Sequence, residues 1–255
     1  MTRLAIVGGA GRMGQALAEG LAARGHAIVA LVDRTQPAAL FGAVHRVSLE
    51  SLEPGSVEAV VDFSSPEGVL ASATWCAAQR IPLVVGATGL TPVERRALEA
   101  TAREVGVVVA ANFAVGAALV ERFATLAAAY FERVEVIELH HDGKVDAPSG
   151  TALATARAIG AARVAAGRPA MHDPTTRATL AHARGAEGPE GVRIHAVRLP
   201  GLVAHEEVIF GSPGEGLTLR HDSYDRQSFV AGVALALAKV TAAPGLVEGL
   251  GALLD

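Results

Sequence analysis

Five short, predominantly apolar runs in the first 112 residues are the feature that most constrains the fold. Each run is apolar along its length rather than at alternate positions. A strand of that kind is buried on both faces, as in a parallel sheet that helices cover on both sides. We therefore predict an α/β fold class, with a doubly wound domain over residues 1–112. The five runs are residues 3–7, 27–33, 57–63, 81–89 and 105–112.

The segments between these runs carry helix signals. Residues 13–25 are predicted to form a helix that closes on Gly25 as its C-cap. In "SSPEG" (64–68) a serine cap precedes a proline in the first turn, and "TPVE" (91–94) is a capping box with proline at the first helical position. Alternating strands and helices are typical of a parallel sheet.

The second half of the chain has a different pattern. Four segments with partial polar alternation read as strands joined mostly by short turns, which predicts an α+β domain with a mixed open sheet over residues 113–224. Helices are expected at about 115–130, 151–166 and 225–240, and a polar, glycine-rich loop at 172–191. The four strand segments are residues 134–141, 192–199, 203–211 and 216–222.

A glycine motif joins the first strand to the first helix. "VGGAGRMG" contains G-x-G-x-x-G as Gly9, Gly11 and Gly14, and Asp33 follows 33 − 14 = 19 residues later, near the spacing of about 20 expected for dinucleotide binding. The alternative is a tight glycine turn without a ligand. Asp33 favours NAD because it can accept hydrogen bonds from ribose hydroxyls, whereas Arg34 could pair with the 2′-phosphate of NADP. The choice between the two cofactors stays open.

Two further groups close the fourth and fifth strands. Carboxyl ends of parallel strands form the ligand crevice in such sheets, so both groups are candidate cofactor contacts. Ordinary turn chemistry explains them equally well. The groups are Gly86, Ala87, Thr88 and Gly89, and Ala110, Ala111, Asn112 and Phe113.

The stretch "HHDGKVDAPSGTA" (140–152) concentrates reactive side chains before a helix. The helix start at Ser149, Gly150 and Thr151 offers free backbone N–H groups to a carboxylate, and Lys144 adds a positive charge. An imidazole, His140 or His141, can exchange a proton at neutral pH. Such a set suits reduction of a small unsaturated carboxylate, although a polar strand end with a capped helix is the plainer interpretation.

Composition limits the other possibilities. The net charge of −4 argues against binding of nucleic acid or an anionic membrane. The longest apolar runs, near 105–120 and 229–238, are shorter than the roughly 20 residues of a membrane span, and glycines come too early for a secretory signal. Cys76 is the only cysteine, which excludes an internal disulfide, and no H-E-x-x-H pattern indicates a metal. We expect a cytoplasmic protein without a metal.

Taken in order, the motifs resemble those of the dihydrodipicolinate reductase family of bacterial and plant lysine and diaminopimelate synthesis. The resemblance spans nearly the whole chain and is carried by "VGGAGRMG", "DFSSPEG", "GATGL", "AANFAVG" and, most specifically, "ELHHDGKVDAPSGTA". It implies a Rossmann domain for NADH and/or NADPH and a second domain for substrate binding and tetramerisation. It also implies that a C-terminal helix (225–255) returns to the first domain.

The resemblance implies a reaction and a role for each matching residue. The reaction is reduction of the dicarboxylate 4-hydroxy-tetrahydrodipicolinate to tetrahydrodipicolinate, with His140 as the catalytic proton donor and Lys144 as a second one. Asp142 and Gly143 depart from the family, which often has basic residues there. The implied substrate contacts are His141, Lys144, Ser149, Gly150 and Thr151. The implied cofactor contacts are Gly8, Gly9, Ala10, Gly11, Arg12, Met13, Asp33, Arg34, Gly86, Ala87, Thr88, Ala110, Ala111, Asn112 and Phe113.

Three other functions compete with this one. Another NAD(P)-dependent oxidoreductase of an amino-acid precursor, such as an aspartate or homoserine dehydrogenase, would share the first domain but would not need the 140–152 stretch. An NAD(H)-sensing regulator would need a basic DNA-recognition segment, and the acidic balance disfavours it. A hydrolase would need a nucleophile elbow, and no G-x-S-x-G is present.

Overall fold

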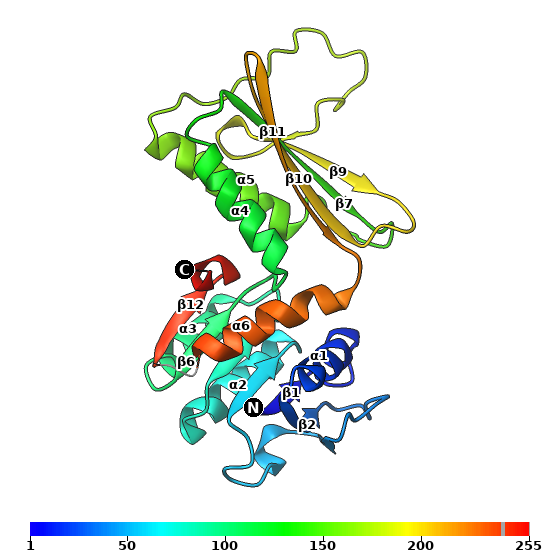
Figure 1. Ribbon diagram of the computed structural model, residues 1–255, viewed down its shortest axis with the longest axis vertical. Helices are drawn as coiled ribbons and strands as arrows, with labels where there is room; N and C mark the ends of the chain where they lie inside the picture. Colours follow the sequence, from blue (N-terminus) through cyan, green and yellow to red (C-terminus); the bar gives the residue numbers. More distant parts are fainter. Residues whose placement is uncertain (241–242, 255) are drawn as a thin grey trace. The chain divides into compact units, whose positions relative to one another are not determined.

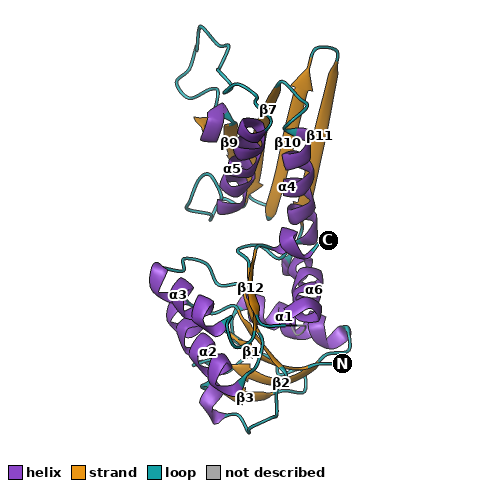
Figure 2. Ribbon diagram, turned by 90° about the vertical axis from the view of Figure 1, so that its left-hand side faces the viewer, coloured by secondary structure: helices purple, strands orange, loops and turns teal. Residues whose placement is uncertain are grey.

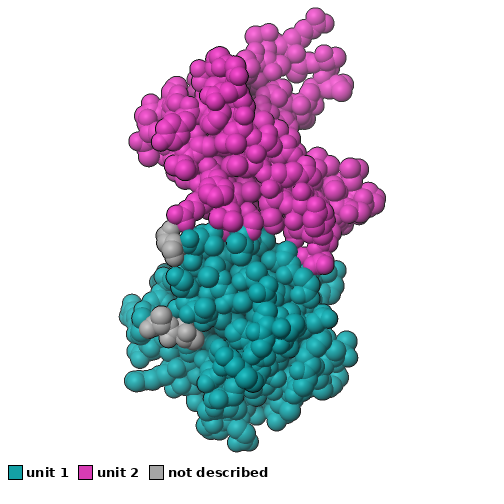
Figure 3. All heavy atoms as spheres, in the orientation of Figure 1, with its two compact units in different colours: residues 1–115, 226–255 teal, residues 116–225 magenta. Residues whose placement is uncertain are grey.

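The computed structural model describes residues 1–240 and 243–254. These residues form two compact units, coloured separately in Figure 3. Unit 1 combines Met1–Val115 with the C-terminal Arg226–Asp255, and unit 2 is Gly116–Asp225. No helix in the described part of the chain is long and apolar enough to cross a membrane.

Unit 1 is built on a seven-stranded sheet in the order β12-β6-β5-β4-β1-β2-β3, and every pairing in it is parallel. The five strands predicted from apolar runs are confirmed. Two strands escaped prediction because they are short and carry polar residues. The strands are β1 (Arg3–Val7), β2 (Ala27–Val32), β3 (Val44–Arg46), β4 (Ala59–Asp62), β5 (Leu83–Val85), β6 (Gly106–Val109) and β12 (Gly245–Glu248).

Helices cover both faces of this sheet, as a doubly wound fold requires (Figure 2). Helices α1 (Arg12–Ala23) and α6 (Val230–Val240) pack on one face, and α2 (Pro66–Gln79) and α3 (Pro92–Thr101) on the other. The expected caps are present, since Ser65 accepts a hydrogen bond from the Gly68 N–H and Thr91 forms a capping box with Glu94. A short 3₁₀ turn, Leu49–Ser51, follows β3.

The C-terminal segment corrects one prediction. We expected a helix over 225–255, but the structure has a 3₁₀ turn (Arg226–Phe229), then α6, then strand β12 and a second turn (Leu250–Leu253). Proline and glycine at 244–245 explain the difference, because proline has no N–H to donate and Gly245 has a φ of 148° that a helix cannot contain. Residues 241, 242 and 255 of the expected helix lie outside the described residues.

Unit 2 is a five-stranded mixed sheet in the order β11-β10-β7-β9-β8, in which only the β7–β9 pair is parallel. Helices α4 (Val115–Ala127) and α5 (Gly150–Ala165) cover one face of the sheet (Figure 1). The core of this unit includes Val136, Ile159 and Phe210. The expected mixed sheet is confirmed, and the 172–191 loop contains β8 and a 3₁₀ turn (Pro189–Gly191). The strands are β7 (Arg133–His140), β8 (Ala186–Glu187), β9 (Arg193–Arg198), β10 (Ala204–Ser212) and β11 (Glu215–Ser223).

Candidate active site

The glycine turn of unit 1 is packed so tightly that side chains cannot enter it. Gly8 has a φ of +80°, and its N–H and that of Gly9 both donate to the Val32 carbonyl, at 2.9 and 3.2 Å. A Cβ on Gly14 would lie 2.2 Å from the Gly8 carbonyl oxygen, and one on Gly8 would lie 2.7 Å from the Phe63 carbonyl oxygen. These positions therefore require glycine for shape alone.

Asp33 fastens the end of β2 to this turn. Its Oδ2 accepts a hydrogen bond from the Ala10 N–H at 3.0 Å, and its Oδ1 accepts one from the Thr35 N–H at 3.0 Å. A carboxylate can accept several hydrogen bonds on each oxygen, so it can still accept bonds from ribose hydroxyls. The side chain of Asp33 thus shapes the turn as well as facing the cavity beside it.

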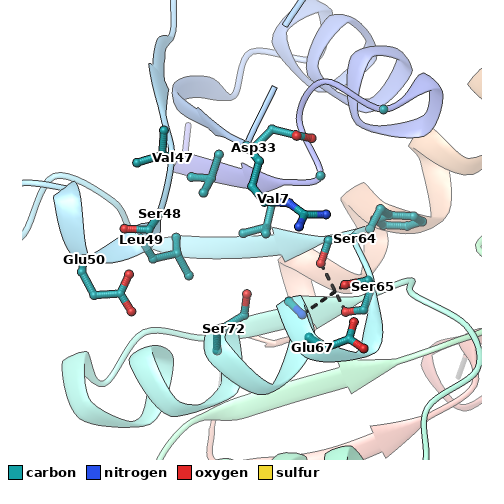
Figure 4. A pocket seen from close by; sticks show the side chains of 17 residues that line it. Val7, Asp33, Val47, Ser48, Leu49, Glu50, Ser64, Ser65, Glu67 and Ser72 are labelled. Carbon is teal, nitrogen blue, oxygen red and sulfur yellow. Dashed lines mark hydrogen bonds between the residues drawn. The ribbon is translucent and has the colours of Figure 1, made fainter. Parts of the chain in front are cut away.

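A cavity of about 560 Å³ opens beside the turn, within the usual size range of small-molecule sites (Figure 4). Of the predicted cofactor contacts, Gly8, Gly11, Asp33 and Arg34 line it. From sequence alone, "SSPEG" is a helix start and part of a family motif with no predicted ligand contact, yet residues of that segment form a wall of the cavity. The lining that sequence reasoning missed includes Val47, Ser48, Leu49, Glu50, Phe63, Ser64, Ser65, Glu67 and Ser72.

The residues around the cavity fit a dinucleotide. Helix α1 begins after Gly11 with no side-chain cap and no acidic residue in its first turn. Its first N–H groups and the helix dipole therefore favour an anion such as a pyrophosphate. The missing side chains of Gly8 and Gly14 let the turn pack against the backbone of Phe63 and against the start of α1, which holds these N–H groups in place.

Asp62, at the end of β4, is a buried carboxyl that sequence reasoning did not single out. It accepts hydrogen bonds from the Ser64 N–H and hydroxyl at 2.9 and 2.6 Å, and from the Ser72 hydroxyl at 2.5 Å. Burial raises the pKa of Asp62, while these donors oppose that shift. Asp62 thereby holds two serines of the cavity wall in place.

The predicted groups at the ends of β5 and β6 lie on neighbouring strands. The Gly86 N–H donates to the Asp62 carbonyl at 2.8 Å, and the Ala110 N–H to the Val85 carbonyl at 3.0 Å. The ring of Phe113 is fully buried against that of Phe63, with ring centres 5.4 Å apart. None of the residues 86–88 or 110–113 lines the cavity described above. The structure therefore brings them to the same sheet edge without making them part of that cavity.

In unit 2 the reactive stretch is organised around Glu138, whose side chain is fully buried near the end of β7. Its carboxylate accepts hydrogen bonds from Arg198 Nη1 and Nη2 at 2.8 and 2.7 Å, from His140 Nδ1 at 2.5 Å, and from the Ser149 N–H at 3.1 Å. Arg198 lies on β9 directly opposite His140. One buried carboxylate thus links His140, Arg198 and the start of α5.

The pKa values in this group reflect burial and charge together. Burial lowers the pKa of His140, the hydrogen bond and charge of Glu138 oppose this, and Lys144 and Arg198 lower it further. Burial alone would raise the pKa of Glu138, but the hydrogen bonds from Arg198 and His140 hold that pKa below its ordinary value. Glu138 is therefore ionised at neutral pH, and its charge favours the imidazolium form of His140 against the effect of burial.

Lys144 and the helix start lie beside this group. Lys144 Nζ donates to both carboxylate oxygens of Asp146 at 2.7 and 2.9 Å, and its N–H donates to the His141 carbonyl at 3.1 Å. Ser149 caps α5 by accepting from the Ala152 N–H at 3.1 Å, and a Cβ on Gly150 would meet open space. The stretch therefore joins a lysine, an imidazole and a helix N-terminus, a set of groups suited to a carboxylate substrate.

No group of three or more His, Cys, Asp or Glu side chains that could hold a metal occurs among residues 1–240 and 243–254. Cys76 is buried, and burial raises the pKa of its thiol. A buried neutral thiol is a poor nucleophile and a poor metal ligand.

Comparison with known proteins decides the family. Residues 2–113 match the family described as "Dihydrodipicolinate reductase, N-terminus", and residues 116–254 match "Dihydrodipicolinate reductase, C-terminus". The chain belongs to the dihydrodipicolinate reductase family. This confirms the resemblance inferred from the motifs, including the reductase character of the relatives.

Individual relatives cover nearly the whole chain. A 4-hydroxy-tetrahydrodipicolinate reductase of Corynebacterium diphtheriae is 44% identical over 99% of this chain and 98% of its own length. One from Listeria welshimeri is 48% identical over 81% and 78% of the two chains. The solved dipicolinate-bound dihydrodipicolinate reductase from Paenisporosarcina sp. TG-14 superposes with a TM-score of 0.89 at 38% identity and full coverage of both chains. An aspartate dehydrogenase from Thermotoga maritima, with a TM-score of 0.52 at 14% identity, shares the fold alone.

Two charged residues of this candidate site were missed by sequence reasoning. Glu138 had a usable signal, because it lies two residues before His140 on a strand and so points to the same face. Arg198 had none, because it reaches Glu138 only through the β7–β9 pairing, 60 residues away in the chain.

Proposed function

We propose that this chain reduces 4-hydroxy-tetrahydrodipicolinate to tetrahydrodipicolinate with NADH or NADPH, as a step of lysine and diaminopimelate biosynthesis. The observation that carries the proposal is that Glu138 binds both His140 and the start of α5, while Arg198 joins Glu138 to Asp146, the residue that binds Lys144. Two findings support the proposal: relatives named 4-hydroxy-tetrahydrodipicolinate reductase match the chain over nearly its whole length, and one solved relative is bound to dipicolinate.

Each residue has a defined task in the proposed reaction. One hydride and one proton are added to the substrate ring, and one water is lost. Bound NADH or NADPH would supply the hydride, and His140 the proton on the neighbouring carbon. Lys144 is the second proton donor and also neutralises a substrate carboxylate. For this, the carboxylate replaces Asp146 as the ion-pair partner of Lys144. His141 and the α5 start at Ser149, Gly150 and Thr151 hold the carboxylates.

Unit 1 is proposed to hold the cofactor, with the backbone of residues 8–13 around the pyrophosphate. Asp33 and Arg34 both line the cavity, so the ribose hydroxyls of NADH and the 2′-phosphate of NADPH each have a partner. We therefore propose use of both cofactors. The predicted contacts at 86–88 and 110–113 lie at the carboxyl edge of the same sheet and are assigned to the remainder of the cofactor.

Unit 2 is proposed to carry the substrate site and the contacts of a homotetramer in the cytoplasm. Its two helices cover one face of the sheet. On the other face Ile209 is 38% exposed, between Val208 and Phe210, which are buried under the helices. The tetramer is proposed from the family resemblance, and this open sheet face is the surface assigned to it.

The test is a coupled turnover assay. The preceding synthase generates the unstable substrate from pyruvate and aspartate semialdehyde, and loss of reduced-nicotinamide absorbance is followed with NADH and NADPH separately. We expect oxidation that depends on the synthase. No oxidation with either cofactor, by protein shown to be folded and to bind nucleotide, would contradict the proposal.

A further inference from the structure

Glu138 occupies a place in unit 2 that packing alone does not explain. A carboxylate is costly to bury, yet the side chain of Glu138 has no exposed surface. Its hydrogen-bond partners come from three elements: His140 from the end of its own strand β7, Arg198 from β9, and the Ser149 N–H from the start of α5. Arg198 also donates to the Asp146 carbonyl at 2.7 Å, the residue whose carboxylate binds Lys144.

This arrangement dictates the state of the His140 ring. An ionised carboxylate can only accept hydrogen bonds, so Nδ1 of His140 must carry a proton in order to bond to it at 2.5 Å. Nε2 is then the nitrogen left to exchange a proton with a substrate. When Nε2 also gains a proton, the adjacent carboxylate stabilises the imidazolium that forms.

We propose that Glu138 is a positioning residue for His140, which fixes the tautomer and orientation of the imidazole, and that Arg198 anchors Glu138 in turn. The proposal rests on the proposed role of His140 as proton donor. Glu138 itself touches neither substrate nor cofactor in this account. It acts through His140 and through the start of α5.

A second group of the same composition on the other face of β7 provides a matched control. Glu135, three residues before Glu138, accepts hydrogen bonds from Arg184 and from His195 Nε2, the latter at 2.7 Å. Its side chain is 33% exposed, whereas that of Glu138 is not exposed at all. Glu135 and Glu138 lie on the same strand, and each binds an arginine and a histidine. Substituting Glu135 therefore removes a comparable glutamate without removing a partner of His140.

The charges around His140 predict that different substitutions shift its pKa in opposite directions. Glu138 favours the imidazolium, whereas Lys144 and Arg198 disfavour it. Glu206, on the neighbouring strand β10, faces Glu138 across the sheet and carries a further carboxyl. Removing the carboxylate with Glu138→Gln should lower the pKa of His140, and removing the guanidinium with Arg198→Gln should raise it.

The test measures His140 directly. Proteins carrying ¹³C-labelled histidine are titrated by NMR, with the His140 signal assigned by its loss in His140→Asn. We expect a lower midpoint in Glu138→Gln, a higher one in Arg198→Gln, a midpoint near wild type in Glu138→Asp, which keeps the charge, and no change in the control Glu135→Gln. Equal midpoints in wild type, Glu138→Gln and Arg198→Gln would overturn the inference. Circular dichroism establishes that each variant is folded.

Turnover supplies the second readout. A proton donor is active while protonated, so the activity falls as pH rises through its pKa. In Glu138→Gln the alkaline limb of kcat/KM should move to lower pH and kcat should fall about 10- to 100-fold, with KM for NADH unchanged. If kcat falls but the alkaline limb of the kcat/KM profile stays at its wild-type pH, Glu138 has a merely structural role and the proposal is overturned. If no variant and no wild-type protein turns over while the NMR midpoints shift as expected, the proposed reaction fails and the positioning of His140 stands.

Discussion

The candidate sites of the two units depend on different interactions. In unit 1 the glycine turn works by shape, because the space that side chains would fill at Gly8 and Gly14 is already taken by backbone. In unit 2 the site works by charge, because Glu138, Arg198 and His140 form hydrogen bonds that depend on ionisation. The comparison teaches that substitutions in unit 1 should act at every pH, whereas those in unit 2 should change the dependence on pH.

The largest expected effect is that of His140→Ala. Removal of a general acid lowers turnover by about 10²- to 10⁴-fold, while the affinity for NADH stays at its wild-type value, since the imidazole belongs to unit 2. Steady-state kinetics and fluorescence titration with NADH measure the two quantities. His195→Ala, which removes the histidine paired with Glu135, is the control and should retain turnover. A His140→Ala enzyme with near-normal kcat would break the assignment.

Sequence reasoning was most successful where local pattern decides structure. The apolar runs of unit 1, the serine cap at Ser65 and the capping box at Thr91 all depend on neighbouring residues, and all were predicted. Strand β12 was missed because its four residues gain their place only by pairing with β6, far away in the chain. The candidate residues of 140–152 were found from their types, whereas Arg198 was not, since sheet register alone brings it to Glu138.

The next largest effect concerns stability in unit 2. Burial raises the pKa of Glu206 to about 7 from 4.5, and its Oε2 has no partner among the described residues. A carboxyl with a raised pKa stabilises the fold below pH 4.5, and that contribution is lost as pH rises towards 7, at most about 3 kcal/mol. Chemical denaturation should show wild type losing stability from pH 5 to pH 8, and Glu206→Gln losing much less. Parallel losses in the two proteins would contradict this.

A smaller effect is expected for the shape-based site. Gly14→Ala places a methyl group 2.2 Å from the Gly8 carbonyl oxygen, so the turn must shift, at a cost of about 1–3 kcal/mol in the free energy of unfolding. The affinity for NADH should fall equally at pH 6 and pH 8. Gly251→Ala, whose Cβ would meet open space, is the control in the same unit. Gly14→Ala protein that binds NADH normally would show that the turn is not part of the cofactor site.

The smallest effect is on cofactor choice. Arg34 is exposed and lines the cavity, so Arg34→Ala should lower kcat/KM with NADPH about 10-fold and leave that with NADH within about 3-fold. The ratio of the two rates, measured at low ionic strength, reports the effect. An equal loss with both cofactors would assign Arg34 to the structure of the cavity rather than to a 2′-phosphate.

The central claim is that a hydride passes to a ring held by unit 2, and isotope transfer tests it most directly. The coupled reaction is run with NADH carrying deuterium at the transferred position, and the tetrahydrodipicolinate formed is examined by mass spectrometry. The account predicts one deuterium bound to carbon in each product molecule. Product without the label, formed while NADH is oxidised, would contradict it.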